Sequence, residues 1–218
     1  MVRRDGRNRS SVTTTPDLPN VVWQHDSRCI HHGVEDAGAC LERQKQVKRL
    51  LIGCGPTRMP GFIGIDIIGG PTVDIIASAD KLPFKDGEVD AIVAEHVIEH
   101  LTYYQFNKAM AEWYRVLKSG GTLELECPDL LEWCKQFVAA NEYGRYTSHK
   151  GHWPIIAHFY GHQRGRNEAE EMSQVHKSGY TEDHLVEVLL GLGYDQISAV
   201  PAKKTCCAPV IRIRAVKQ

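Results

Sequence analysis

Five short apolar runs between residues 48 and 127 constrain the fold more than any other feature of the chain. Each run is rich in β-branched and aliphatic residues, and each is bounded by glycine, proline or aspartate, which end strands and make turns. The runs are KRLLIGCG, FIGIDII, VDIIASA, EVDAIVAEH and TLELEC. Continuously apolar runs are typical of strands that are buried on both faces in a parallel sheet. We therefore predict an α/β domain with a mostly parallel sheet.

Three other segments have the spacing of helices. Residues 102–118 begin with Thr102 and Gln105 in the arrangement of a capping box, and an apolar stripe at helical spacing follows. We expect two further helices, over 130–140 and over 181–193.

The last part of the chain predicts two closing strands. They cover residues 196–202 and 209–217. In the second, isoleucine alternates with arginine from Ile211 to Arg214, which is the pattern of a strand with one apolar face. The two strands are close enough along the chain to form a hairpin.

Length, charge and cysteine content narrow the classes of function. A chain of 218 residues fits one domain with extensions better than two domains. The formal charge of −1 gives no overall attraction to nucleic acid, and no apolar run is long enough to span a bilayer. Seven cysteines without a C-x-x-C pair favour a reducing cytoplasm. We expect a cytoplasmic protein with neither nucleic-acid nor membrane partners, and its oligomeric state stays open.

The chain divides into three expected parts. Residues 1–20 predict a disordered basic tail, for which a nucleic-acid arm is the alternative, and 21–46 form an N-terminal extension. Residues 47–218 form the main domain, in which 141–180 are an expected lid over the acceptor. The extension holds a histidine and cysteine cluster whose spacing fits no metal-site pattern. Its members are His25, Cys29, His31, His32 and Cys40.

The ends of the apolar runs supply the candidate binding groups, because parallel α/β sheets bind ligands at the carboxyl ends of their strands. The first run ends with Gly53 and Gly55, where missing side chains let a ligand approach the backbone. The second ends with Asp66, whose carboxylate could accept hydrogen bonds from both hydroxyls of a ribose. After the third run, Asp80 could accept a hydrogen bond from an exocyclic amine, and Leu82 offers an apolar wall to an aromatic base.

The fourth run leads into HVIEH, which matches the H-x-x-E-H signature of inverted zinc peptidases. On a helix, His96, Glu99 and His100 share a face, so two imidazoles could hold zinc while the carboxylate activates water. Such a site also needs a third protein ligand and an open cleft. Zinc hydrolysis is therefore one alternative function.

In their order and spacing, these segments resemble the class I S-adenosylmethionine-dependent methyltransferases, most closely the small type 11 methyltransferase domain. The resemblance covers about residues 47–130 and rests on LLIGCG, GIDI, ADKLPFKDGEVDAIVAEHVIEHL and EWYRVLKSGGTLELECPDL. It implies S-adenosylmethionine as the cofactor and a Rossmann-like sandwich. That sandwich has a mostly parallel seven-stranded sheet, its last strand antiparallel, with helices on both faces. One departure is the link over residues 56–61, which is too short for the usual crossover helix.

The resemblance also implies a role for each strand end. The two glycines would pack against the methionyl part of the cofactor, and Asp66 would hold its ribose. Asp80 and the two backbone amides that follow it would hold the adenine. Glu95 and His96 would face the cleft. The expected cofactor-binding residues are Gly53, Cys54, Gly55, Asp66, Ile67, Asp80, Lys81, Leu82 and Glu95.

Methyl transfer needs few protein groups, because the sulfonium of the cofactor already makes the methyl electrophilic. A hydroxyl or amine acceptor must lose a proton, and His96 and His176 are the candidate general bases because imidazole titrates near neutrality. A structural histidine with satisfied hydrogen bonds is the alternative for each. In the lid, we expect Tyr160 and His162 to line the acceptor site.

We therefore predict a methyltransferase that moves a methyl group to an oxygen or nitrogen of a small-molecule or sugar-type acceptor. A non-catalytic module on the same fold, binding the cofactor or a partner, is an alternative, as is the zinc hydrolase. Metal-assisted transfer is a minor option. Some ubiquinone-pathway and small-RNA methyltransferases hold a divalent ion with E-x-x-E-H at this helix, where this chain has His96 in place of the first glutamate.

Overall fold

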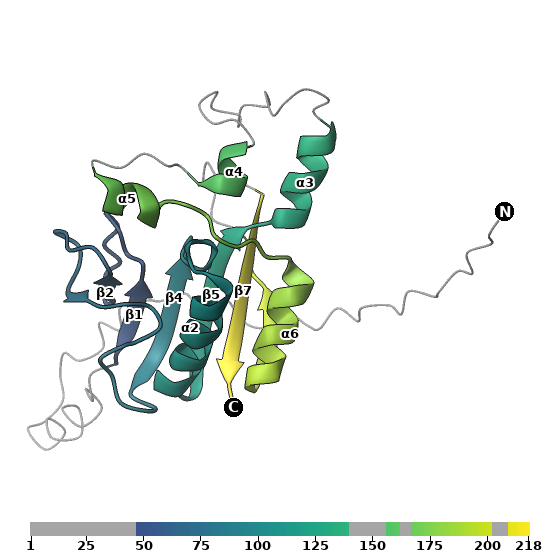
Figure 1. Cartoon of the computed structure of the whole chain (residues 1–218). Coiled ribbons are helices and arrows are strands. Elements are labelled where there is room, and N and C mark those ends of the chain that lie inside the picture. The colour runs from purple at the N-terminus through teal and green to yellow at the C-terminus, as the bar shows by residue number, and fades with distance from the viewer. Residues whose placement is uncertain (1–46, 140–155, 162–166, 202–208) are drawn as a thin grey trace, which may run out of the picture. The chain divides into compact units, whose positions relative to one another are not determined.

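The computed structural model describes residues 47–139, 156–161, 167–201 and 209–218 (Figure 1). They belong to the larger of two units into which the chain divides, Lys45–Gln218. The expected basic tail, the N-terminal extension with its histidine and cysteine cluster, and His162 lie outside the described residues. Within the described part, no helix has both the length and the apolar character needed to cross a membrane.

Seven strands form one sheet in the order β3-β2-β1-β4-β5-β7-β6. From β3 to β5 every neighbouring pair is parallel, whereas β7 is antiparallel to both β5 and β6. The strands are β1 (Arg49–Ile52), β2 (Ile63–Asp66), β3 (Ile75–Ile76), β4 (Val89–Glu95), β5 (Leu117–Pro128), β6 (Tyr194–Ala199) and β7 (Val210–Lys217). The predicted mostly parallel sheet with an antiparallel last strand is confirmed.

The described helices are the 3-10 turn η1 (Ile98–His100), α2 (Tyr103–Val116), α3 (Leu130–Ala139), α4 (Ile156–Tyr160), α5 (Glu168–Ser173) and α6 (Glu182–Leu192). Three of them, α2, α3 and α6, begin and end close to the predicted residues, whereas α4 and α5 were not predicted. The predicted capping box is present, because the Thr102 hydroxyl accepts the Gln105 amide at 3.3 Å and the Gln105 side chain accepts the Thr102 amide at 3.0 Å. The α6 helix ends at Gly193, whose φ of 96° is the left-handed conformation of a C-terminal glycine.

Two strands differ in length from the prediction. Only Ile75 and Ile76 of the run 73–79 form strand β3, because the Asp74 carboxylate accepts the Gly64 amide at 2.7 Å in place of a backbone ladder bond. Strand β5 begins at Leu117 and runs beside β4, where Leu117 pairs with Val89. The chain therefore passes from α2 into β5 without a loop.

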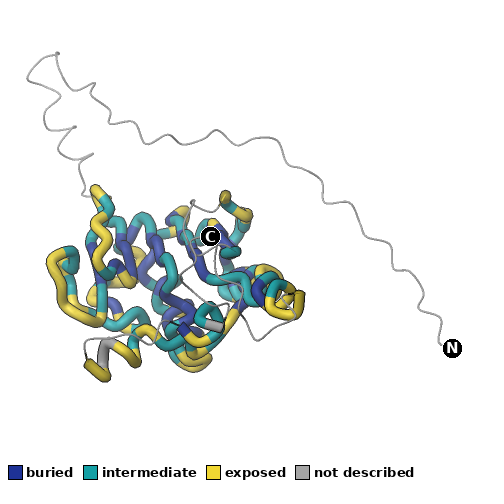
Figure 2. The backbone as a smooth tube through the Cα atoms, turned by 90° about the horizontal axis from the view of Figure 1, so that it is seen from above, coloured by how far each residue is buried: buried dark blue, intermediate teal, exposed yellow. Residues whose placement is uncertain are grey.

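The main core lies between one face of the sheet and helices α2 and α6. Figure 2 shows the buried stretches of the backbone in dark blue. Trp113 of α2 is fully buried there, and its indole donates to the Ala79 carbonyl at 2.8 Å. A smaller apolar cluster includes Leu51 and Val93, against which Met59 and Phe62 of the β1–β2 link pack. That link forms turns without a helix, which confirms the predicted absence of a crossover helix.

Candidate active site

Asp66, at the end of β2, holds together the two loops that follow β1 and β2. One carboxylate oxygen accepts the Gly55 amide at 2.9 Å, and the other accepts the Ile68 amide at 3.0 Å. A carboxylate has about four acceptor positions, so two of them stay available for a ligand. The first two strand ends are thus brought together, as the sequence predicts.

The two glycines of the first loop differ in the space around them. Gly53 has a φ of 63°, and a Cβ there would lie 2.4 Å from Val97 Cγ2, so no larger residue fits. Gly55 has a φ of 48° and open space where its Cβ would be. The open space beside Gly55 leaves the backbone accessible to a ligand.

The side chains of Cys54 and Ile67, two predicted cofactor-binding residues, differ in burial. Cys54 is buried in the small apolar cluster, and burial, together with the nearby Asp66 charge, raises the pKa of its thiol. Ile67 is 65% exposed beside Asp66. Of the two, only Ile67 has a side chain exposed enough to contact a ligand, whereas Cys54 packs in the core.

The segment after β3 is fixed against α2 by hydrogen bonds. The Lys81 amide donates to the Ser78 carbonyl at 3.0 Å, and the Leu82 amide donates to Glu112 at 2.8 Å. The Leu82 side chain is 4% exposed and belongs to the main core. The prediction that Leu82 forms an apolar wall for a base is therefore wrong, because core packing takes its side chain. Asp80, whose carboxylate accepts the Ser78 hydroxyl, stays at the surface edge of this segment.

Glu95, the last residue of β4, lies 3.1 Å from the guanidinium of Arg212 on β7. Arg212 is buried and also pairs with Glu126 at 2.6 Å and with Glu124 of β5. The Glu95 carboxylate is thus tied into an ion-pair network across three strands. Sequence reasoning missed this network, although the alternation in β7 did place its arginines on the face away from the isoleucines.

His96 has a φ of 55°, a left-handed conformation that is strained for a residue with a side chain. Its ring lies between two carboxylates, with Nδ1 3.0 Å from Glu99 and Nε2 3.5 Å from Glu126. Burial acts to lower the pKa of His96, but the hydrogen bonds with Glu126 and Glu99 outweigh it and raise the pKa to about 10. The two carboxylates therefore favour the protonated imidazole, and the role of His96 as a general base stays a prediction.

The HVIEH segment does not form the predicted peptidase helix. Only Ile98–His100 make a single 3-10 turn, and His96 points to the glutamates on either side of its ring. Instead, Glu99 and His100 come together with His176, which lies far along the chain, and one ligand atom of each lies within 4.8 Å of the others. In the H-x-x-E-H zinc signature the third group would be His96, but in this structure His176 takes that place beside Glu99 and His100.

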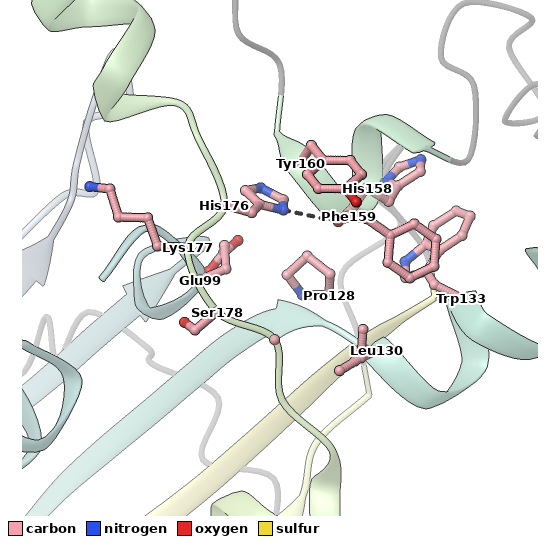
Figure 3. A pocket seen from close by; sticks show the side chains of 11 residues that line it. Glu99, Pro128, Leu130, Trp133, His158, Phe159, Tyr160, His176, Lys177 and Ser178 are labelled. Atoms are coloured by element: carbon pink, nitrogen blue, oxygen red, sulfur yellow. Dashed lines mark hydrogen bonds between the residues drawn. The ribbon is translucent and has the colours of Figure 1, made fainter. Parts of the chain in front are cut away.

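A cavity of about 250 Å³ lies beyond the carboxyl ends of β4 and β5 (Figure 3). Aromatic and aliphatic side chains from α3 and α4 form one wall, and Glu99, His176 and the residues after it form the other. The lining residues are Glu99, Pro128, Leu130, Trp133, His158, Phe159, Tyr160, His176, Lys177, Ser178 and Gly179. Trp133, which is 2% exposed, stacks on His158 with ring centroids 3.7 Å apart.

The predicted acceptor residues Tyr160 and His176 both reach this cavity. Tyr160 is 56% exposed, and the His176 ring is oriented by a contact between Nδ1 and the His158 carbonyl at 2.9 Å. Trp133 and His158 were missed. Trp133 lies in the helix predicted over 130–140, and nothing in the spacing indicates that it faces a cavity.

Backbone contacts between distant segments hold the cavity wall in place. The Lys177 amide donates to the Glu99 carbonyl at 2.7 Å, and the Ser178 hydroxyl donates to the Leu101 carbonyl at 3.0 Å. Gly161, at the end of α4, pairs with Val175 in an isolated bridge. The segment 175–178 therefore joins α4 to the turn after β4.

A family model described as methyltransferase domain matches residues 66–125. None of the curated proteins matches the sequence. The match spans the stretch from Asp66 through β4 and α2 into β5, which contains the strand ends at the centre of the site.

Solved structures with the same fold include two S-adenosylmethionine-dependent methyltransferases from archaea. The one from Archaeoglobus fulgidus has a TM-score of 0.51 at 15% identity and covers 82% of this chain and 92% of its own. The one from Methanosarcina mazei has a TM-score of 0.51 at 17% identity, with 82% and 96% covered. An N1-methyltransferase from Burkholderia thailandensis, bound to 1,6-didemethyltoxoflavin and S-adenosylhomocysteine, has a TM-score of 0.49 at 14% identity, with 84% and 77% covered. The first two comparisons show the class I fold.

Proposed function

Because the chain carries a methyltransferase domain on the class I fold, we propose that it transfers the methyl group of S-adenosylmethionine to an oxygen or nitrogen of a small-molecule acceptor. The observation that carries the proposal is the family match over residues 66–125, which contains the Asp66 carboxylate and the end of β4. The order of the strands supports neighbouring places for the two ligands at the carboxyl ends of the strands.

The cofactor is assigned to the ends of β1, β2 and β3. The two free acceptor positions of Asp66 suit the two hydroxyls of a ribose. Gly55 has room beside it for the methionyl part, and the exposed Ile67 side chain offers an apolar surface to the adenine. Asp80 is the acceptor for the exocyclic amine of that base.

The acceptor is assigned to the cavity beyond β4 and β5. Its volume of about 250 Å³ suits a ligand of one or two rings, and the exposed Tyr160 ring provides a flat surface for stacking. The buried Trp133 ring, stacked on His158, supports the wall behind it. Glu99 and His176 add polar groups on the opposite wall. The neighbouring carboxylates favour the protonated form of His96, so we assign His176 as the imidazole that faces the acceptor.

A reducing cytoplasmic setting fits this proposal. The three cysteines within the described residues, Cys54, Cys127 and Cys134, are free thiols. Free thiols persist where glutathione keeps the compartment reduced.

The test begins with calorimetric titration of the full chain with S-adenosylmethionine, repeated for Tyr160→Ala. We expect micromolar binding to both proteins, because Tyr160 lines the acceptor cavity. Transfer of a labelled methyl group is then measured over a panel of aromatic and sugar-like hydroxyl and amine compounds. Turnover that falls in Tyr160→Ala through a raised KM supports the assignment of the acceptor.

Two outcomes would contradict the proposal. Absence of cofactor binding in the unaltered protein would remove the methyltransferase function. Binding without turnover on any acceptor would favour a non-catalytic module on the same fold.

A further inference from the structure

Glu99, His100 and His176 form a polar cluster on the wall of the acceptor cavity. One ligand atom of each residue lies within 4.8 Å of the other two. We propose that this cluster binds one divalent transition-metal ion, with its open coordination positions facing the cavity.

Glu99 is 1% exposed, yet its Oε2 atom has no hydrogen-bond partner. The other carboxylate oxygen contacts the His96 ring at 3.0 Å. A buried carboxylate oxygen without a partner is costly, and native structures keep one mainly where an ion, a water or a ligand completes it. A cation beside Glu99 supplies the missing interaction.

The two histidine rings are each oriented by a backbone carbonyl. His100 Nδ1 lies 3.2 Å from the Val175 carbonyl, and His176 Nδ1 lies 2.9 Å from the His158 carbonyl. Because a carbonyl only accepts hydrogen bonds, Nδ1 of each neutral ring carries the hydrogen and Nε2 carries the lone pair. Metal-ligating histidines are held in this manner, with the second ring nitrogen donating to a carbonyl or carboxylate. The rings lie edge to face, with centroids 4.9 Å apart, so both nitrogens can approach one ion.

Two imidazoles and one carboxylate are the donor set of zinc, manganese, iron or cobalt sites rather than of calcium or magnesium sites, which prefer oxygen ligands. Three protein ligands leave one or more positions open, as in catalytic metal sites. Glu99 and His176 also line the cavity, so a molecule there can complete the coordination.

The consequence for the reaction rests on the proposed methyltransferase function. A hydroxyl oxygen of the acceptor that binds the ion becomes more acidic and loses its proton to water. The oxygen then forms a bond to the methyl carbon as the bond from that carbon to sulfur breaks, which leaves the neutral thioether and the methylated acceptor. His176 would act here as a metal ligand and not as the base, and the preferred acceptor would be a hydroxyl compound.

The test is titration of the chelator-treated full chain with cobalt(II), followed by the visible absorption of the bound ion. We expect one cobalt per chain. Glu99→Gln keeps the shape of the side chain and should weaken binding by about tenfold or more, as should His176→Ala. His184→Ala, on the nearby α6 and outside the cluster, is the matched control and should bind as the unaltered chain does.

The histidine-rich N-terminal extension supplies a second control. If cobalt binding persists in Glu99→Gln and His176→Ala but is lost in His31→Ala/His32→Ala, the ion belongs to the extension and the proposed site is wrong. Absence of bound cobalt in a chain whose thermal unfolding is normal also overturns it. S-adenosylmethionine binding, measured in the same samples, separates this failure from a failure of the methyltransferase function, because the cofactor residues lie on other strands.

Discussion

The proposed cofactor edge, formed by the ends of β1, β2 and β3, and the proposed acceptor cavity take their residues from different distances along the chain. The cofactor edge takes its groups from residues 53–80, and hydrogen bonds join each loop to its neighbour in sequence. The acceptor cavity takes its groups from Glu99 to Gly179, and its wall depends on contacts between segments that are far apart.

This difference has a physical cause. Groups at the ends of adjacent parallel strands are brought together by the sheet alone, so a short stretch of sequence is enough to specify them. The cavity wall needs α3, α4 and the segment after α5 to pack on one another, and each contact can be altered without disturbing the strand ends. We therefore expect the two sites to respond independently to substitution.

The largest effect is expected for Asp66→Ala at the cofactor edge. The change removes the acceptor of the Gly55 and Ile68 amides and the proposed partner of the ribose, so the Kd for S-adenosylmethionine should rise by about 100-fold or more. Calorimetry measures this value. Asp86→Ala removes an exposed carboxylate that pairs with Arg115 and is the matched control, which should bind the cofactor normally. Equal loss in both variants would mean that the effect is not local.

The next effect is expected for Gly161→Ala on the acceptor side. A Cβ at this position would lie 1.9 Å from the Gln174 carbonyl oxygen, and the φ of 77° is itself unfavourable for alanine. We expect α4 to move from the segment 174–176, at a cost of about 1–3 kcal/mol. Turnover of the acceptor should fall about tenfold, while the Kd for S-adenosylmethionine stays within about twofold.

Gly191→Ala is the control for that change, because it lies in α6 with open space around its Cβ. It should raise the free energy of unfolding by about 0.5–1 kcal/mol and leave turnover unchanged. A parallel loss of cofactor binding in Gly161→Ala would show that the two sites are coupled.

A smaller effect is expected for Glu112→Gln. The Glu112 side chain on α2 accepts the Leu82 amide and so supports the proposed cofactor edge. Hydrogen bonds from Arg115 lower the pKa of Glu112 against the opposing effect of burial, and the Leu82 amide adds to them. Because the folded pKa is lowered, the stabilisation is present above about pH 4.5 and is lost as the pH falls through the folded pKa. The substitution should cost about 1–2 kcal/mol at pH 7.

Urea unfolding at pH 7 and at acid pH measures this contribution. The gap between Glu112→Gln and the unaltered chain should narrow in acid, and the Kd for the cofactor should rise by only a few-fold. Glu132→Gln, which breaks an exposed pair with Lys135, should change stability by less than about 0.5 kcal/mol at either pH. A constant gap at both pH values would rule out the ionised Glu112 as its source.

The smallest effect concerns thiol reactivity. Cys134 on α3 is exposed, whereas burial raises the pKa of the Cys127 thiol well above its usual range. Iodoacetamide at pH 8 should therefore modify Cys134 about 100-fold faster than Cys127, as measured by peptide mass spectrometry. The difference should disappear in denaturant. Similar rates in the folded protein would contradict the buried position of Cys127.

Much of the fold could be predicted from the sequence, because its five apolar runs and the capping box at Thr102 are local signals. The lengths of β3 and β5 could not, because they depend on the Asp74 contact with Gly64 and on pairing with the start of β4. In the candidate site, too, only the features set by local sequence could be predicted. Asp66 and its glycines could be predicted from their places after strands.

The role of His96 could not be predicted in this way. Imidazole alone suggests a base, but Glu126, thirty positions later in the sequence, lies beside the ring and raises its pKa. The pairing of His176 with Glu99 and His100 likewise needs the packing of the segment after α5. Whether a histidine acts as a base, a cation or a metal ligand depends on the side chains around it. When those side chains come from distant strands or from the lid, the spacing of residues in the sequence does not reveal them.

The position of β7 has a consequence for the order of folding. It is translated after every other strand, yet it lies between β5 and β6 and joins residues as far apart as Thr122 and Val216. Strands β1 to β5 can pair while the chain is still growing, but β6 has no neighbour until β7 arrives. Nascent chains that stall before Val210 therefore expose an open edge at β5, and they are the species most in need of protection from aggregation.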